Sequence, residues 1–195
     1  MGGVCARRKE KEDPAIKKNP YEGLTLDQQV HAAACNCDTA YIERLGEEGK
    51  ADLNCRREPD ACVALDSVAW CGATDCALAL LKYGADPSLT THAIVGAAST
   101  GEPKMLEAML KAGGPANQEM SDCSALRWAA EANQEECVIL LLEHGAWKAE
   151  EDQDTVLRKF KRRRMKNALA KLAEMYPILA EDCVCPAWYA QCPLL

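Results

Sequence analysis

Apolar and small residues recur along this chain with one fixed internal spacing. An apolar residue is followed 19 positions later by a glycine, and two small residues lie three and four positions after the opening residue. The opening residues and their glycines are Val30 and Gly49, Leu65 and Gly84, Ile94 and Gly113, and Leu126 and Gly145. A constant core joined by connectors of variable length is typical of a stacked repeat protein.

The copy that opens at Ile94 indicates how each repeat is built. Its first half has small residues where a neighbouring helix must come close, and Gly101 is expected to end that helix in the left-handed conformation. Pro103 suits the first turn of a second helix, where its missing N–H has no cost. An apolar face then follows at helical spacing, formed by Met105, Leu106, Met109 and Leu110. The pattern predicts two short helices joined by a tight turn.

The other copies follow the same plan. Thr25 and Gln28 form a capping-box pattern ahead of the first copy. Gly72 stands where Gly101 stands in its copy, and Cys37 and Asn133 take that position in the first and fourth copies. Asparagine tolerates the left-handed conformation, whereas cysteine does so poorly.

These units resemble ankyrin repeats over about residues 24 to 176. The residues that carry the resemblance are Leu126–Ala130, Leu141-Leu142 and Gly145-Ala146, with Gly84–Pro87 and Asp52–Asn54 in the turn positions. The resemblance implies an all-α, ankyrin-type helix-turn-helix solenoid of four to five repeats. Its hairpin connectors are expected to be short or vestigial, because little chain separates Gly84 from Ile94.

The predicted organisation is one array between two tails. Residues 1-23 form a basic N-terminal tail that we expect to be disordered, residues 24-176 form the array, and residues 177-195 form an irregular tail with proline and cysteine. The repeat units are placed near 25-54, 60-87, 92-117 and 123-148, with a closing unit at 154-176. No segment approaches 18 uninterrupted apolar residues, so no membrane span is expected.

The chain has 12 cysteines, but it shows no pattern typical of a secretory signal. We therefore expect reduced thiols in a cytosolic setting, with Cys71, Cys76 and Cys137 as small buried residues within helices. His31 with Cys35 and Cys37 resembles a metal site only weakly, and so does the cysteine group around Cys192. Packing in the first helix accounts for His31 and Cys35, so neither a metal nor another cofactor is expected.

Charge divides the chain into three parts. Residues 21 to 154 hold 9 basic and 24 acidic residues, whereas residues 1 to 20 have a balance of +3. The acidic array would repel nucleic acid, so no nucleic-acid partner is expected. Between residues 155 and 173 the charged residues are all basic, and the core of this patch is Arg158, Lys159, Lys161, Arg162, Arg163, Arg164 and Lys166.

That basic patch has three interpretations. It is the solvated face of a closing helix whose buried side is formed by Leu157, Phe160, Met165, Leu169 and Leu172. It could instead contact anionic lipid headgroups, or serve as a nuclear import signal from Lys161 to Lys166.

The N-terminus has a lipidation pattern. Removal of Met1 would expose Gly2 for myristoylation, and Cys5 lies where a second acyl chain is often added. A single myristoyl chain binds membranes only marginally, so a second chain or a basic patch is needed for stable anchoring. Cys192 fits a C-terminal prenylation pattern, although Pro193 is a poor residue for it.

No catalytic constellation is recognisable in the sequence, so we expect a protein that is not an enzyme. The resemblance implies an adaptor or scaffold that binds a protein partner, and the acidic array favours a partner with a basic segment. The chain is expected to be monomeric. Membrane association at the cytoplasmic face is expected if the acyl groups are present. The alternatives are a nuclear regulatory protein and a regulatory subunit of an enzyme complex. The repeat register predicts that the binding surface exposes Trp70, Arg127, Trp128 and Trp147.

Overall fold

The computed structural model describes residues 19–59, 61–147 and 150–175, with residues 150–154 described for their backbone only. Within these ranges the chain forms ten α-helices, a short 3₁₀ helix and one small hairpin. The α-helices are α1 Leu26–Cys35, α2 Thr39–Glu48, α3 Ala64–Cys71, α4 Thr74–Lys82, α5 Ala93–Thr100, α6 Pro103–Lys111, α7 Ala125–Ala132, α8 Glu135–Glu143, α9 Glu150–Arg163 and α10 Lys166–Met175.

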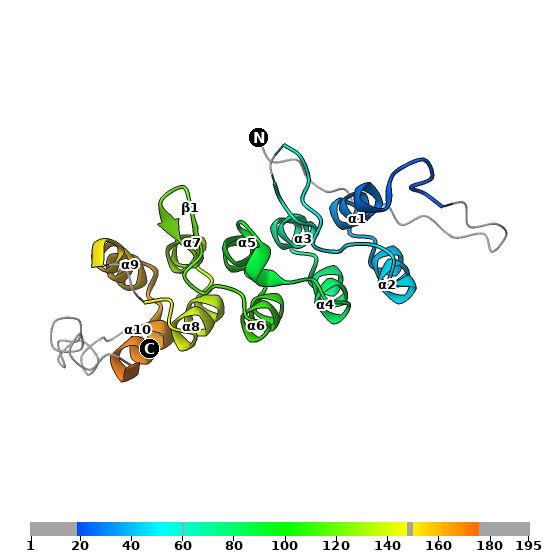
Figure 1. Ribbon diagram of the computed structural model, residues 1–195. Coiled ribbons are helices and arrows are strands. Elements are labelled where there is room, and N and C mark those ends of the chain that lie inside the picture. The colour runs from blue at the N-terminus through cyan, green and yellow to red at the C-terminus, as the bar shows by residue number, and fades with distance from the viewer. Residues whose placement is uncertain (1–18, 60, 148–149, 176–195) are drawn as a thin grey trace.

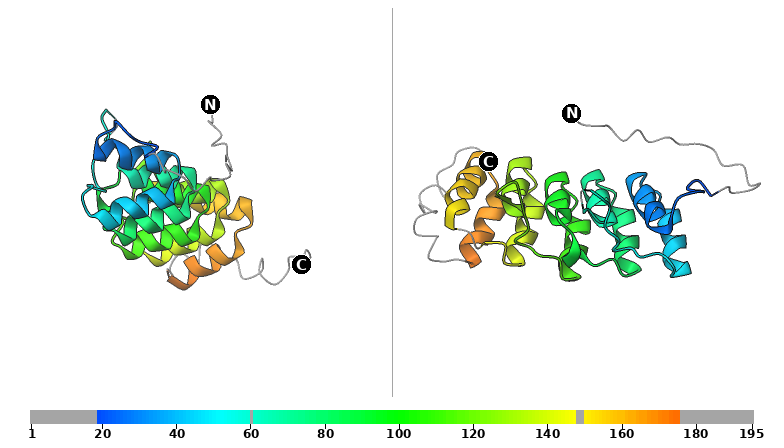
Figure 2. Two further views of the ribbon diagram at one scale, coloured as in Figure 1. Left: turned by 90° about the vertical axis from the view of Figure 1, so that its right-hand side faces the viewer. Right: turned by 45° about the horizontal axis from the view of Figure 1, so that its top comes forward.

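The helices form five successive pairs that stack in chain order into an elongated array (Figures 1 and 2). Figure 1 shows the odd-numbered helices in one row and the even-numbered helices in a second row beside it. Each helix contacts its pair partner and the equivalent helix of the next pair. The predicted all-α solenoid is therefore confirmed.

Close approach between the odd-numbered helices depends on small side chains. The four small-residue pairs predicted at the helix contacts are all fully buried. At Gly96 of α5, an added Cβ would lie 3.2 Å from the Ala69 Cβ and 3.3 Å from the backbone nitrogen of Trp70. Helix α5 therefore lies against the backbone of α3, at a separation that leaves almost no room for a methyl group.

Caps define the helix ends where the sequence predicts them. Thr25 and Gln28 form a reciprocal capping box at the start of α1. Cys37 and Asn133 occupy the turns after α1 and α7 with positive φ angles of 54° and 63°. The turn position thus keeps its left-handed conformation even where the residue is not glycine, and at Cys37 this conformation is the less favourable one for the side chain.

The connectors differ from one pair to the next. A two-residue hairpin, β1 Glu119–Met120 and β2 Cys123–Ser124, precedes α7, and its turn residues Ser121 and Asp122 both have positive φ. That pair of angles matches the turn class favoured in tight hairpins. Before α3 there is a single bridge between Arg57 and Cys62. Between α4 and α5 the chain forms only the 3₁₀ helix η1 Pro87–Leu89, as expected for a vestigial hairpin.

The closing pair packs its apolar side against the array. Phe160 and Met165 are fully buried, and Leu172 of α10 is buried with them. The Glu135 carboxylate of α8 accepts hydrogen bonds from the backbone N–H groups of Asn167 and Ala168 at 2.7 and 3.1 Å. Because these N–H groups lie in the first turn of α10, Glu135 caps that helix from the preceding pair. In the described residues, no helix is both long and apolar enough to cross a membrane.

Candidate protein-binding surface

Trp70 and Trp128 lie against each other although they belong to different helix pairs. Trp70 is the next-to-last residue of α3 and is 40% exposed, while Trp128 is half-buried in α7. Their ring centroids are 6.4 Å apart and the rings are nearly perpendicular, at 89°. This edge-to-face geometry is favourable for aromatic pairs.

Small residues in the intervening helix allow this contact. Helix α5 lies between α3 and α7 in the row of odd-numbered helices (Figure 1). In the repeat register, α5 has Gly96 where α7 has Trp128, and Ser99 where α3 has Trp70. Because α5 carries no bulky side chain at either position, the two indole rings meet across it. We call Trp70 and Trp128 the tryptophan pair.

The hairpin orients one member of the tryptophan pair. Trp128 Nε1 donates a hydrogen bond to the Met120 carbonyl oxygen of β1 at 3.4 Å. Met120 itself is half-buried and packs against the core. The β1–β2 hairpin therefore holds the Trp128 ring, while Trp70 keeps the more exposed position.

Beside the tryptophan pair, Glu131 of α7 joins basic residues from two helices. Its carboxylate accepts hydrogen bonds from Arg127 Nε at 3.4 Å and from Lys159 Nζ of α9. The hydrogen bond from Lys159 holds the pKa of the Glu131 carboxyl below its ordinary value, and Arg127 adds to the effect. Arg163 Nη2 also donates to the Glu131 carbonyl oxygen at 3.0 Å. Sequence reasoning missed Glu131, because no pattern in the chain pairs it with α9.

Two residues of the basic patch, Lys159 and Arg163, contact Glu131 of α7. Six residues of the patch are exposed, and they extend from the second half of α9 to the first residue of α10: Arg158, Lys161, Arg162, Arg163, Arg164 and Lys166. Solvated positive charge therefore lies at the last helix pair of the array.

The predicted exposure of Trp147 is wrong. Its side chain is only 7% exposed and belongs to the buried core. The residue follows Gly145 and Ala146 in the segment that leads from α8 toward α9. Trp147 therefore contributes to packing, while Trp70, Trp128 and Arg127 remain accessible.

Two predictions about cysteines are also wrong. Cys35 and Cys71 lie at helix ends and are exposed, whereas Cys76 and Cys137 are buried as expected. His31 is buried, and its Nε2 lies 3.0 Å from the Cys55 carbonyl oxygen. No disulfide joins the cysteines of the part of the chain that the structure describes.

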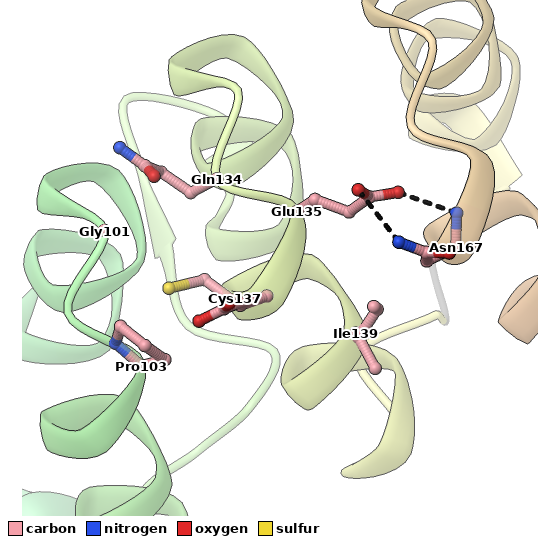
Figure 3. A pocket seen from close by; sticks show the side chains of 8 residues that line it. Gly101, Pro103, Gln134, Glu135, Cys137, Ile139 and Asn167 are labelled. Carbon is pink, nitrogen blue, oxygen red and sulfur yellow. Dashed lines mark hydrogen bonds between the residues drawn. The ribbon is translucent and has the colours of Figure 1, made fainter. Parts of the chain in front are cut away.

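A hollow of about 440 Å³ lies where the turns of three helix pairs meet (Figure 3). Its wall includes Pro103, Cys137 and Asn167, and Glu135 is held there by its hydrogen bonds to Asn167. Burial raises the pKa of the Cys137 thiol to about 12. Because the thiol stays protonated near neutral pH, Cys137 is not an activated nucleophile.

The lipidation residues predicted at Gly2, Cys5 and Cys192 lie outside the described residues.

Comparison with known proteins agrees with this architecture. Residues 121–152, which include β2, α7 and α8, match the Ankyrin repeat family model. No curated protein matches the chain. Ankyrin repeats mediate binding between proteins, and the other helix pairs repeat the arrangement of the matched unit (Figure 1). Residues 121–152 therefore form an ankyrin repeat, and the helical stack that contains them is an ankyrin-type solenoid.

Proposed function

We propose that this array is a non-enzymatic adaptor that binds a protein segment across its odd-numbered helices, with the tryptophan pair as the anchor. The exposed contact between Trp70 and Trp128 is the observation that supports this proposal. Tryptophan is enriched at the energetic centres of interfaces, where it contributes a large apolar area. The hairpin pre-orients Trp128, which lowers the cost of ordering that side chain on binding.

The charge distribution favours a partner with a basic segment. Residues 21 to 154 carry 24 acidic against 9 basic residues, so the array attracts positive charge. A lysine or arginine of the segment can also lie over the Trp70 ring. The exposed basic residues of α9 would repel such a segment at one end of the array. The segment is therefore expected to extend from the tryptophan pair toward α1.

Parallel capture experiments test this anchor. The full chain, Trp70→Ala and Leu78→Ala are used as baits, because Leu78 of α4 is a large apolar residue of similar exposure, 39% against 40%. Loss of an interface anchor costs at least about 2 kcal/mol, which is roughly a 30-fold weaker affinity. Proteins retained by the full chain and by Leu78→Ala should be depleted with Trp70→Ala. Equal retention by all three baits would contradict the proposal.

We also propose that acylation at Gly2, with Cys5 as a second acylated residue, places the adaptor at the cytoplasmic face of a membrane. The exposed basic residues at the end of α9 support this, because each cation near an anionic surface adds about 1 kcal/mol of attraction. Cell fractionation of Gly2→Ala tests the anchor. The variant should move to the soluble fraction, and an unchanged membrane fraction would reject the idea.

Nuclear import is a second candidate, supported by the exposure of Lys161, Arg162, Arg164 and Lys166. Replacement of these four residues by glutamine separates the two localisations. Loss of nuclear protein in the variant supports import, whereas loss of membrane-bound protein supports the lipid contact.

A further inference from the structure

Three side chains with metal-binding chemistry meet at the junction of the second and third helix pairs. Cys62 lies just before α3, Asp66 lies in the first turn of α3, and His92 is the residue that precedes α5. One ligand atom from each side chain lies within 4.8 Å of the other two. The proposed binding function does not use any of these residues.

Asp66 is the fixed member of the group. Its side chain is buried, with 1% exposure. Carboxylate Oδ2 accepts hydrogen bonds from the backbone N–H groups of Val63 and Thr91, at 3.1 and 3.2 Å, and from the Thr91 hydroxyl. Oδ1 accepts a bond from the His92 N–H at 2.8 Å. The carboxylate is therefore held in one orientation by two connectors, and Oδ1 retains a lone pair on the side of His92.

His92 can present its Nδ1 atom to the same space. Nδ1 lies 3.9 Å from Asp66 Oδ1 and 2.8 Å from the Thr91 hydroxyl. A hydroxyl has one proton, so while Thr91 donates to Asp66 its oxygen accepts from a protonated Nδ1. A shift of the ring proton to Nε2 makes the Nδ1 lone pair available and leaves the Thr91–Asp66 bond intact. Imidazole in this tautomer is a common metal ligand.

Cys62 completes the set with a sulfur ligand. It is half-buried, and its Sγ lies 3.9 Å from the Thr91 hydroxyl, which also contacts Asp66 and His92. Its backbone is held by the bridge to Arg57. Thiolate and imidazole favour zinc, whereas magnesium and calcium prefer oxygen ligands alone.

We propose that Cys62 Sγ, Asp66 Oδ1 and His92 Nδ1 bind a zinc ion, with water as the fourth ligand. Zinc bond lengths of about 2.0 to 2.3 Å place tetrahedral ligands about 3.3 to 3.8 Å apart. The three ligand atoms reach this geometry if the distances between them shorten by about 1 Å. Cys62 and His92 are both half-buried and lie in connectors, so their side chains can rotate inward while Asp66 stays in place.

The charges of such a site balance. Zinc binding displaces the thiol proton of Cys62 to solvent, and the resulting thiolate and the Asp66 carboxylate together neutralise the 2+ charge of the ion. The ion would join the connector before α3 to the start of α5. The connector between α4 and α5 contains the 3₁₀ helix η1 rather than a hairpin. The metal would therefore link two repeats at a place where no hairpin joins them.

Cobalt(II) titration of the reduced full chain tests the site, because cobalt reports thiolate ligation by its absorption and zinc should displace it. We expect one cobalt ion to give a thiolate charge-transfer band. Cys62→Ser should abolish that band, and His92→Gln should weaken binding at least about tenfold. Asp66 is not substituted, because it also caps α3.

Matched controls distinguish this site from the other thiols of the chain. Cys71→Ser and His144→Gln change an exposed cysteine and an exposed histidine elsewhere in the array. Both controls should bind cobalt as the unmodified chain does. The proposal is overturned if the chain binds no cobalt, if Cys62→Ser and His92→Gln leave the band and affinity unchanged, or if the controls lose them equally. Circular dichroism of each variant establishes that it is folded, and either one of the two site variants suffices for the test.

Discussion

Trp70 and Trp128 form an edge-to-face pair, with ring centroids 6.4 Å apart, across a helix to which neither belongs. The contact links the second and fourth helix pairs directly. In a solenoid most contacts join adjacent repeats. The tryptophan pair is therefore a source of coupling beyond nearest neighbours as well as the proposed anchor.

A double-mutant cycle measures this coupling. Trp70→Ala, Trp128→Ala and the double variant are compared by urea unfolding. Trp128→Ala should lower the free energy of unfolding by about 2 kcal/mol. This is less than the loss expected for a fully buried aromatic residue, because the Trp128 ring is half-buried. The interaction free energy of the pair should be about 1 kcal/mol. Additive effects of the two substitutions would show that the ring contact does not stabilise the fold.

The contact of Lys159 with Glu131 should make docking of the closing pair sensitive to acid. The pKa of Glu131 is lowered in the folded state. Its contribution to the free energy of unfolding is therefore present above the unfolded pKa and is lost as pH falls through the folded pKa. Because the Glu131 side chain is 42% exposed, Glu131→Gln should cost less than about 1 kcal/mol at pH 7. The difference in unfolding free energy between the variant and the unmodified chain should shrink as pH falls from 7 toward 3, when both are followed by urea unfolding. A difference that does not shrink in acid would contradict the assignment.

Thiol reactivity should separate the cysteines by burial. Cys35 and Cys71 are exposed and should react first with iodoacetamide at pH 7.5, whereas Cys137 should react only after unfolding. Mass spectrometry of the labelled peptides measures the order. Early labelling of Cys137 would mean that α8 opens readily.

The same burial predicts a loss of stability in alkali. Burial raises the pKa of Cys137 to about 12 and that of Cys55 to about 11. The neutral thiols contribute fully to the stability of the fold below the unfolded pKa of a thiol, about 8.5. That contribution is lost as pH rises through the pKa values of the folded state. Cys137→Ala should therefore reduce the slope of stability against pH between pH 9 and pH 11. Urea unfolding at each pH provides the measurement.

Gly96 should not tolerate a methyl group. The added Cβ of Gly96→Ala would meet Ala69 at 3.2 Å and the α3 backbone at 3.3 Å, and the backbone cannot rotate away. Overpacking of this kind costs about 1 to 3 kcal/mol, against a gain in helix propensity of up to about 1 kcal/mol. A net destabilisation of about 1 kcal/mol is expected from these two effects in thermal or urea unfolding. Ser99→Ala, in the same helix, is the control and should be nearly neutral; stabilisation by Gly96→Ala would show that α3 and α5 can separate.

The local elements of this protein follow from the sequence because helix signals are short-range. The capping box at Thr25, the proline at 103 and the positive φ at Asn133 each depend on residues within one or two turns. Helical spacing likewise identifies the buried face of each helix, because residues three and four apart share a face. On that basis the sequence predicts the burial of the residues that open the four repeats, Val30, Leu65, Ile94 and Leu126.

Contacts between repeats were not predictable in the same way. The repeat register places Trp70 and Trp128 on exposed positions, but it does not show that the rings meet. Their contact depends on how closely α3, α5 and α7 stack, and that distance is determined by Gly96 in a helix between them. Trp147 shows the reverse case, since it is buried although the repeat register predicts an exposed position.

By itself, the sequence determined the repeat, its two helices and the face that each helix buries, because these properties arise from backbone geometry and side-chain periodicity within one unit. Only the tertiary structure decided which side chains from different units share a surface. The tryptophan pair, the link from Glu131 to Lys159 and the group of Cys62, Asp66 and His92 all join residues across repeats. Their positions depend on connector length and stacking distance, which vary between copies and have no periodic signal in the chain.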